Sequence, residues 1–189
     1  MEQYLRQHRI IADGAFGTYY AQKYDTLEMP ELANTEHPER VKEIHLEYIN
    51  AGANLIRTNT FASNTENISG DFQKVKENME QAVSIAKAAE KESGKEIYVV
   101  GDIGPKERRE TKEYCNLVNI FVANNVSVIN FETFADLDDI LPAIRLAKEN
   151  NCFVMVQFCV NQYGYSSLGL SARKLIEKAY KVAEIDGRI

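Results

Sequence analysis

The sequence predicts an α/β fold, specifically a partial TIM (β/α)8 barrel built from about five βα units of parallel sheet. Short, nearly continuous apolar runs alternate with segments of helical periodicity, which is typical of strands buried on both faces of a parallel sheet. Right-handed crossovers would join these strands into one sheet. Polar residues also gather where the apolar runs end, and barrels of this class place their sites there.

The expected strands are the apolar runs near residues 10–13, 54–58, 96–101, 126–131 and 153–158. Each run precedes a segment whose apolar residues recur at helical spacing, beginning with Val41, Ile44 and Tyr48. Pro38 and Gly52 mark the ends of that helix, and Ser171 is the expected N-cap of the last one.

The connections after the first two strands are long, over residues 14–37 and 60–71, and we interpret both as loops. Extra length on this side of a sheet is typical of a barrel's active-site face. A doubly wound open sheet is the alternative arrangement. The chain has neither a GxGxxG nor a GxxxxGK[ST] motif, so the nucleotide-binding versions of that fold lack support.

The domain organisation follows from length. A complete barrel takes about 250 residues, whereas this chain has 189, and its last residues, 186–189, stand where a sixth strand would begin. We therefore expect residues 1–189 to form a single incomplete barrel domain, with either an open sheet or a place in a longer protein. Open edges favour self-association or pairing with a missing C-terminal part. A monomer by light scattering, at concentrations on the order of tens of micromolar, would contradict this expectation.

Composition excludes several classes of protein. A formal net charge of -6 argues against nucleic-acid and anionic-membrane partners, which require a basic face. The sequence has no apolar run long enough to span a membrane and no signal-peptide pattern at residues 1–6, so we expect a cytoplasmic protein. The cysteines Cys115, Cys152 and Cys159 show no CxxC spacing and are expected to be reduced thiols.

Two carboxylates stand out at the strand ends. Asp13 and Glu132 follow the first and fourth runs, which face each other across an eight-stranded barrel. They could bracket a small cation such as the ammonium group of an amino acid. Gly14 and Ala15 could offer backbone N–H groups to the carboxylate of the same ligand. The structural alternative is that both acids cap nearby loops or pair with Arg57.

A metal site has little support from the residues. The three histidines, His8, His37 and His45, fall before the first strand, in a loop and in a helix. None of them stands at ligand spacing from a cysteine. The sequence therefore predicts no metal ligands.

Several motifs occur together in a fixed order: DGAFGT at 13–18, EL-N at 31–34, HxxYxxAGA at 45–53, RTNTF at 57–61, GDIGP at 101–105, FETF at 131–134 and a looser match at 153–171. On these motifs the sequence resembles the homocysteine S-methyltransferase family. This homocysteine-binding barrel is found alone, in cobalamin-dependent methionine synthase, and fused to methylenetetrahydrofolate reductase. The likeness runs from near residue 8 to near residue 185.

The resemblance implies a barrel that binds homocysteine and zinc. Zinc keeps the homocysteine sulfur as a thiolate, which attacks an activated methyl group and gives methionine. The substrate-binding residues implied by the motif match are Asp13, Gly14, Ala15, Phe16, Asn59, Thr60 and Glu132. The two acids would hold the amino group, the backbone amides at 14 and 15 would approach the carboxylate, and the others would line the pocket.

The chain also departs from the family pattern. The family's zinc ligands are three cysteines, one in an Asn-Cys pair after the sixth strand and two in a Gly-Gly-Cys-Cys-Gly turn. None of Cys115, Cys152 and Cys159 matches them, and the loop after Gly104-Pro105 is shorter than usual. We therefore expect no bound zinc, no catalytic residue within the chain, and a truncated methyltransferase that is inactive alone.

Two questions stay open at this point. The alternative to a methyltransferase is a non-catalytic decayed paralogue, or a binding or assembly module with an open barrel arc. The family uses several methyl donors: methyltetrahydrofolate through cobalamin, S-methylmethionine, S-adenosylmethionine and betaine. Overall likeness to bacterial methionine synthase barrels favours the folate route.

Overall fold

The computed structural model describes residues 7–108 and 110–185. Its elements are, in chain order, α2 (Phe16–Tyr24), the 3-10 helix η1 (Pro30–Leu32), α3 (Ala33–Glu36), α4 (Pro38–Asn50), β1 (Leu55–Arg57), α5 (Phe72–Ser93), β2 (Tyr98–Ile103), α6 (Thr111–Ala123), β3 (Val128–Phe134), α7 (Leu141–Glu149), β4 (Phe153–Phe158) and α8 (Ala172–Ile185). The expected βα alternation is confirmed. The proposed start of a sixth strand at 186–189 lies outside the described residues.

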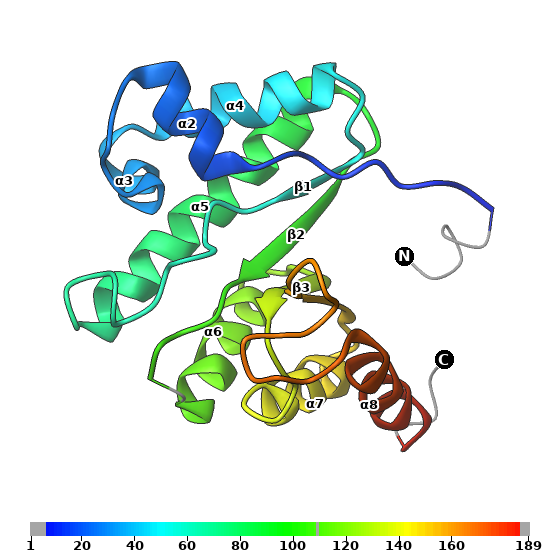
Figure 1. Cartoon of the computed structure of the whole chain (residues 1–189). Helices are drawn as coiled ribbons and strands as arrows, with labels where there is room; N and C mark the ends of the chain where they lie inside the picture. The colour runs from blue at the N-terminus through cyan, green and yellow to red at the C-terminus, as the bar shows by residue number, and fades with distance from the viewer. Residues whose placement is uncertain (1–6, 109, 186–189) are drawn as a thin grey trace.

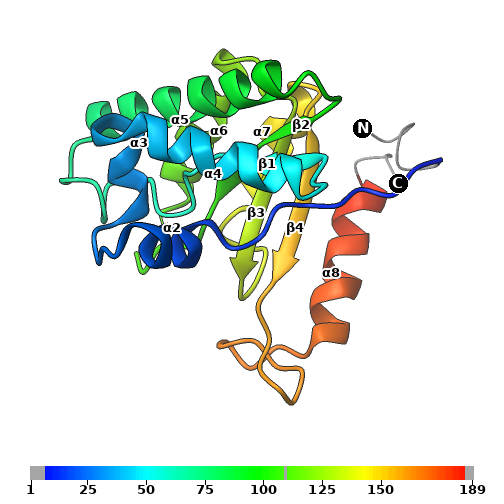
Figure 2. The same ribbon diagram turned by 90° about the horizontal axis from the view of Figure 1, so that it is seen from above.

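The strands form one open parallel sheet in the order β1-β2-β3-β4. Helices follow one another around the outside of this sheet, with α4 packed on α5, α5 on α6, and α6 on α7 (Figures 1 and 2). Because every strand runs in the same direction, the carboxyl ends of β1, β2 and β3 meet at one rim. The α/β class and the arc-like, unclosed sheet are therefore confirmed.

The strand expected at residues 10–13 is reduced to a single bridge. Ala12 pairs in parallel with Leu55, and the backbone N–H of Asp13 donates to the Leu55 carbonyl at 2.9 Å. One residue earlier the ladder gives way to a side chain, because the N–H of Ile11 donates to Asn54 Oδ1 at 2.8 Å. The prediction of a full strand is wrong in extent, although its position beside β1 and its direction are correct.

The stretch 14–37, predicted as a loop, contains α2, η1 and α3. The helix α2 presents Phe16, Tyr20 and Tyr24 at four-residue spacing, and Tyr20 is buried in a cluster with Val41 and Ile44 of α4. Tyrosine rings bury large apolar areas although the residue is polar at its tip. The prediction is wrong because the apolar repeat of α2 consists of Phe16 and two tyrosines, and tyrosine gives a weak apolar signal in a sequence.

The main core lies between the sheet and helices α5, α6 and α7. Helix α6 approaches the sheet so closely at Gly101 that a Cβ there would lie 2.7 Å from the Phe121 ring. Phe121 is fully buried, so the ring has no free volume into which to move. Glycine at this position therefore sets the distance between β2 and α6.

Helix ends follow the expected chemistry. Pro38 occupies the first turn of α4, and the Ser171 hydroxyl accepts from the N–H of Lys174 at 3.3 Å at the start of α8. Asp71 caps α5 by accepting from the N–H of Gln73 at 2.9 Å. These local signals confirm the helix starts predicted at Pro38 and Ser171.

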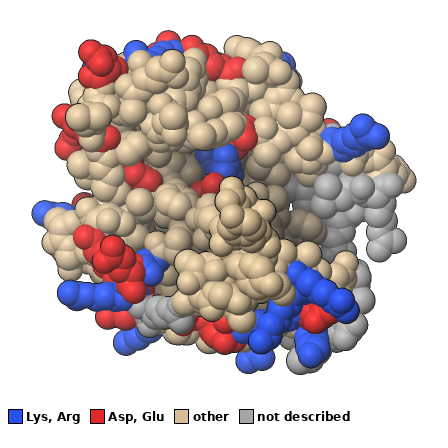
Figure 3. All heavy atoms as spheres, viewed as in Figure 1, with Lys and Arg blue, Asp and Glu red and all other residues tan. Residues whose placement is uncertain are grey.

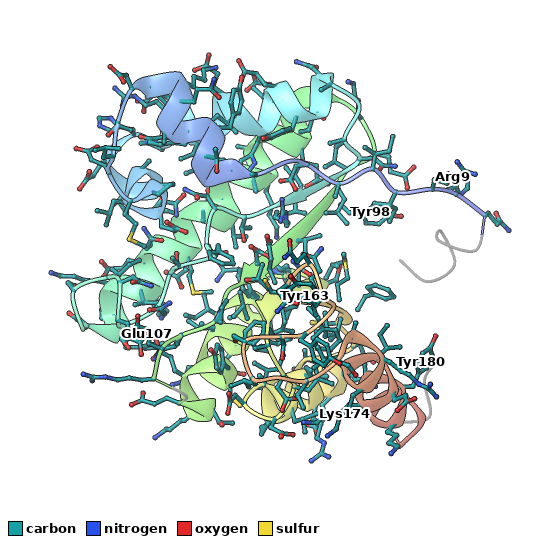
Figure 4. All side chains as sticks on the ribbon, viewed as in Figure 1. Arg9, Tyr98, Glu107, Tyr163, Lys174 and Tyr180 are labelled. Carbon is teal, nitrogen blue, oxygen red and sulfur yellow. The ribbon has the colours of Figure 1, made fainter. Side chains whose placement is uncertain are left out.

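The β4 side of the molecule exposes several large apolar side chains. Tyr163 in the loop after β4 is 76% exposed, and Tyr180 and Ile176 on α8 are 58% and 51% exposed (Figure 4). At the other edge of the sheet, Ile11 is 61% exposed. The self-association expected from open edges stays a prediction. Within the described part of the chain, no helix combines the length and apolar character needed to cross a membrane.

Candidate functional site

A pocket of about 380 Å³ lies at the carboxyl ends of β1, β2 and β3, beside the start of α2. Figure 3 shows a hollow near the centre of this face, where basic and acidic side chains lie side by side. The residues lining the pocket are Asp13, Ala15, Phe16, Gly17, Thr18, Met29, Pro30, Glu31, Arg57, Thr58, Asn59, Thr60, Phe61, Ala62, Asp102 and Glu132. Of the seven residues implied by the motifs, Gly14 alone does not line it.

Arg57 stands between the two carboxylates that the strand ends bring together. Its Nε donates to Asp13 Oδ1 at 2.8 Å, and its Nη1 forms an ion pair with Glu132. Its Nη2 donates to the Gly14 carbonyl at 2.8 Å. The structural alternative, in which both acids pair with Arg57, is therefore the arrangement in this structure.

Asp13 is anchored from two directions. Its second carboxylate oxygen accepts from the backbone N–H of Arg57 at 2.9 Å, and its side chain is only 1% exposed. Burial raises the pKa of Asp13, and the Arg57 guanidinium opposes this rise. Burial also acts to lower the pKa of Arg57, but the Asp13 and Glu132 carboxylates outweigh it and raise that pKa. Arg57, Asp13 and Glu132 therefore form a cluster of three charged groups in which the guanidinium compensates the charge of both acids.

The first turn of α2 faces the same pocket. Ala15 occupies the N-cap position and has no side-chain oxygen to cap the helix, while Gly17 and Thr18 line the pocket. The first N–H groups of a helix have no acceptor within the helix, and they carry its positive dipole end. Tyr48 fixes the entry to α2 by donating its hydroxyl to the Ala15 carbonyl at 3.1 Å. This turn can therefore receive an anionic group.

Asn59 and Thr60 form a wall whose donors are already used. Asn59 Nδ2 donates to the Pro30 carbonyl at 2.7 Å and to Asn34 Oδ1 at 3.0 Å. The Thr60 hydroxyl donates to the Asp102 carbonyl at 2.7 Å. Both residues line the pocket as expected, and their hydrogen bonds hold the loop after β1 against its neighbours. They shape the pocket more than they offer donors to a ligand.

A β-bulge sets the direction of Glu132. In the β3–β4 ladder Phe131 pairs with Val156 and Phe134 with Phe158, so β3 carries one extra residue between the two pairs. Thr133, directly after Glu132, adopts φ 61°, a left-handed conformation that is uncommon for a β-branched residue. Bulges re-aim a side chain next to the ladder that they interrupt. The extra residue thus lets Glu132 face Arg57 while Phe131 and Phe134 both stay in the core.

Several known proteins are similar to this chain in sequence. The sequence model of a family described as homocysteine S-methyltransferase matches residues 10–186. This chain belongs to the homocysteine S-methyltransferase family. One relative is the S-methylmethionine–homocysteine S-methyltransferase BHMT2 of Pongo abelii, 26% identical over 137 residues, which cover 68% of this chain and 36% of that protein. Another is the methionine synthase of Mycobacterium tuberculosis, 31% identical over 114 residues, which cover 53% of this chain and 10% of that protein.

The fold has solved counterparts. The metallated form of the homocysteine methyltransferase MmuM from Escherichia coli superimposes with a TM-score of 0.79 at 18% identity, covering 95% of this chain and 73% of that one. At this identity the likeness shows the fold alone. This member of the family thus spans nearly three quarters of that structure, but only about a third of the BHMT2 relative.

The three cysteines of this family member lie in different segments of the chain. Cys115 is half-buried on α6, Cys152 is buried with its thiol directed at the Val126 carbonyl at 3.6 Å, and Cys159 is exposed after β4. Burial raises the pKa of both Cys115 and Cys152, which disfavours the thiolate that zinc requires. Across residues 7–108 and 110–185, no three histidine, cysteine or acidic side chains are placed to hold a metal ion.

Three ionisable residues that line the pocket are not among the expected binding residues: Glu31, Arg57 and Asp102. The motifs point to Arg57 only as a structural partner of the two acids. Glu31 is buried and accepts from the N–H of Ala62 at 2.9 Å, and burial raises its pKa. All three fall within the conspicuous motifs RTNTF, GDIGP and EL-N. The motifs therefore mark the segments that form the pocket. Which polar residue of each motif faces the pocket depends on the direction of its side chain, which the sequence does not give.

Proposed function

We propose that this chain forms the amino-acid-binding part of a homocysteine S-methyltransferase, an enzyme that transfers a methyl group to homocysteine sulfur to give methionine. The observation that carries the proposal is that Asp13 and Glu132 line one pocket together with the first turn of α2. A zwitterionic amino acid has the complementary pair of charges. Membership of the family supports the choice of homocysteine.

In this proposal the ammonium group of homocysteine binds beside Asp13 and Glu132. The pocket also contains Asp102, whose carboxyl group acts on the Arg57 guanidinium together with those of Asp13 and Glu132. A second cation would improve this balance, and charge-assisted hydrogen bonds would make its binding effective. The substrate carboxylate would then lie against the N–H groups that begin α2, where helix geometry favours an anion.

Asp13→Asn is expected to weaken binding of L-homocysteine about tenfold or more, because one charge-assisted contact is replaced by a neutral one. Isothermal titration calorimetry measures the dissociation constant, and circular dichroism checks that the variant is folded. Asp71→Asn is the matched control, since asparagine caps a helix as well as aspartate and Asp71 lies outside the pocket lining. Equal affinities of Asp13→Asn and the wild type would contradict the proposed site.

The proposal is limited to binding, because the described residues do not fit the zinc ion that the family uses. We expect the purified chain to contain no stoichiometric zinc, and we expect homocysteine binding to be unchanged by a chelator. Elemental analysis and calorimetry with and without EDTA measure these two properties. Tightly held zinc at one ion per chain would show that the chain builds a metal site from residues not recognised here. Without such a site, we propose that the chain alone is inactive in methyl transfer.

A non-catalytic binding or assembly module is the second candidate function. The exposed Tyr163, Ile176 and Tyr180 on the β4 side favour it, since monomeric proteins rarely leave large apolar patches uncovered. The folate–cobalamin route for the methyl group stays a prediction, because the relatives include both a methionine synthase and an S-methylmethionine-dependent enzyme by name.

A further inference from the structure

We propose that Asp102 is a third ammonium-binding carboxyl group of the pocket, which is protonated while the pocket is empty and releases its proton when the ligand's ammonium group binds. This inference rests on the proposed function, because homocysteine supplies the ammonium group. It adds a binding residue and predicts that ligand binding is coupled to proton release.

The position of Asp102 supports this role. It lies near the end of β2, the strand between β1, which carries Arg57, and β3, which carries Glu132. Asp102 lines the pocket and yet is only 3% exposed. Its cross-strand neighbour Asn130 donates from Nδ2 to Asp102 Oδ1 at 2.7 Å. Asp102 is thus fixed at the inner wall of the same pocket.

The surrounding charges leave Asp102 without a full counter-ion. The charged groups that act on it are Arg57 from β1 and Glu132 from β3, and Arg57 is also paired with Asp13. Each nitrogen of the Arg57 guanidinium donates to another group, namely Asp13, Glu132 or the Gly14 carbonyl. The Arg57 guanidinium is therefore in direct contact with Asp13 and Glu132, and it acts on Asp102 only through its charge.

Burial and a neighbouring negative charge both favour the protonated form of Asp102. Burial raises the pKa of Asp102 well above its usual value, and the neighbouring Glu132 carboxylate raises it further, while Asn130 and Arg57 only partly oppose the rise. The side-chain oxygen of Asn130 is also fully buried and has no hydrogen-bond partner among the described residues. The buried polar cluster at Asp102 therefore contains one acceptor, Asn130 Oδ1, that receives no hydrogen bond from the described residues.

Binding of an ammonium group reverses this preference. A cation within a few ångströms stabilises the ionised carboxylate, so the O–H bond of Asp102 breaks and its proton passes to solvent. The products are an ammonium–carboxylate ion pair and one free proton, and no other bond changes. A neutral ligand in the same place would leave the proton on Asp102.

Calorimetric titration with L-homocysteine at about pH 7.5, in phosphate and in Tris, tests the proposal, because these buffers differ in their enthalpy of protonation. The dependence of the observed heat on the buffer counts the protons released. We expect Asp102→Asn to release about one proton fewer than the wild type and to bind about tenfold more weakly. Any proton from the substrate thiol contributes equally to both proteins and cancels in the comparison. Asp71→Asn, outside the pocket, should behave as the wild type does.

Infrared difference spectroscopy supplies a second measurement that needs only the wild-type chain. The C=O stretch of a neutral carboxylic acid should be present in the empty protein and should disappear on addition of L-homocysteine. Equal proton release by the wild type and Asp102→Asn, or an acid band unchanged by bound homocysteine, would overturn this inference and leave the proposed function intact. Absence of homocysteine binding to the wild type would overturn both.

Discussion

Arg57→Met is expected to lower the free energy of unfolding by about 3–5 kcal/mol at about pH 8, the usual consequence of removing one partner from a buried ion pair. Methionine keeps the apolar length of the side chain and removes only the guanidinium. Asp13, whose side chain is 1% exposed, then loses its ion-pair partner, and Glu132 loses the same partner. Urea denaturation followed by circular dichroism measures the loss.

The dependence of this loss on pH tests its cause. Arg57 holds down the pKa of Asp13 against burial, so its removal raises that pKa further in the folded state. A carboxyl group with a raised folded pKa favours the folded state below its unfolded pKa, and this contribution is lost as pH rises through the folded value. The difference between Arg57→Met and the wild type should therefore be smaller at about pH 5 than at about pH 8.

Arg173→Met is the matched control, since Arg173 pairs with Glu177 on the exposed face of α8. Surface pairs of this kind contribute little, and we expect no measurable loss of stability there. If Arg57→Met were as stable as Arg173→Met at about pH 8, the cluster of Arg57, Asp13 and Glu132 would not be a linked ion pair.

The second large effect is acid lability caused by His45. This α4 residue is 0% exposed, neither ring nitrogen has a hydrogen-bond partner in the described chain, and the Phe16 ring lies 5.3 Å from it, centroid to centroid. Burial lowers the pKa of His45 from 6.5 to about 4. The unfolded chain therefore binds a proton that the folded chain does not, over the range between these two values. We expect up to about 3 kcal/mol of stability, present above pH 6.5, to be lost as pH falls to about 4.

His45→Phe removes this titration and keeps an aromatic ring beside Phe16. Plotted against pH, the unfolding free energy of this variant should be flatter between about pH 6.5 and 4 than that of the wild type. His37→Gln, at a position before α4 whose side chain is 37% exposed, is the matched control. Carboxyl groups titrate in all three proteins, so the comparison isolates His45. Parallel curves for His45→Phe and the wild type would show that His45 does not cause the acid lability.

Much of the fold follows from periodicity alone. The strand Phe153–Phe158 has the predicted bounds, and β2 and β3 begin two residues later than expected and end two to three residues later. The segment 10–13 is weaker than predicted because its pairing with β1 gives way to the Asn54 side chain at Ile11. Hydrophobic patterns identify which residues are buried, but they do not show how many backbone hydrogen bonds each neighbour supplies.

The site was predictable in outline. Parallel strands bring their carboxyl ends to one rim, so Asp13 and Glu132 could be placed together from chain order. The direction of the long Arg57 side chain depends on its three hydrogen-bond acceptors, which belong to Asp13, Glu132 and Gly14. All three are distant from Arg57 in sequence. The raised pKa of Asp102 depends on burial and on Glu132, which belongs to another strand. Both are tertiary effects that motif spacing does not contain.

The extra residue in β3 links the direction of the Glu132 side chain to the packing of the core. Phe131 and Phe134 are three residues apart and both face inward, and Phe134 packs edge-on against Tyr114 of α6 with ring centroids 5.6 Å apart. A regular strand would turn one of them outward and would change the face on which Glu132 stands. The direction of the Glu132 carboxylate therefore depends on the aromatic packing of Phe134 against Tyr114. In the proposed site, substitutions at Phe134 or Tyr114 are therefore expected to change substrate affinity as well as stability.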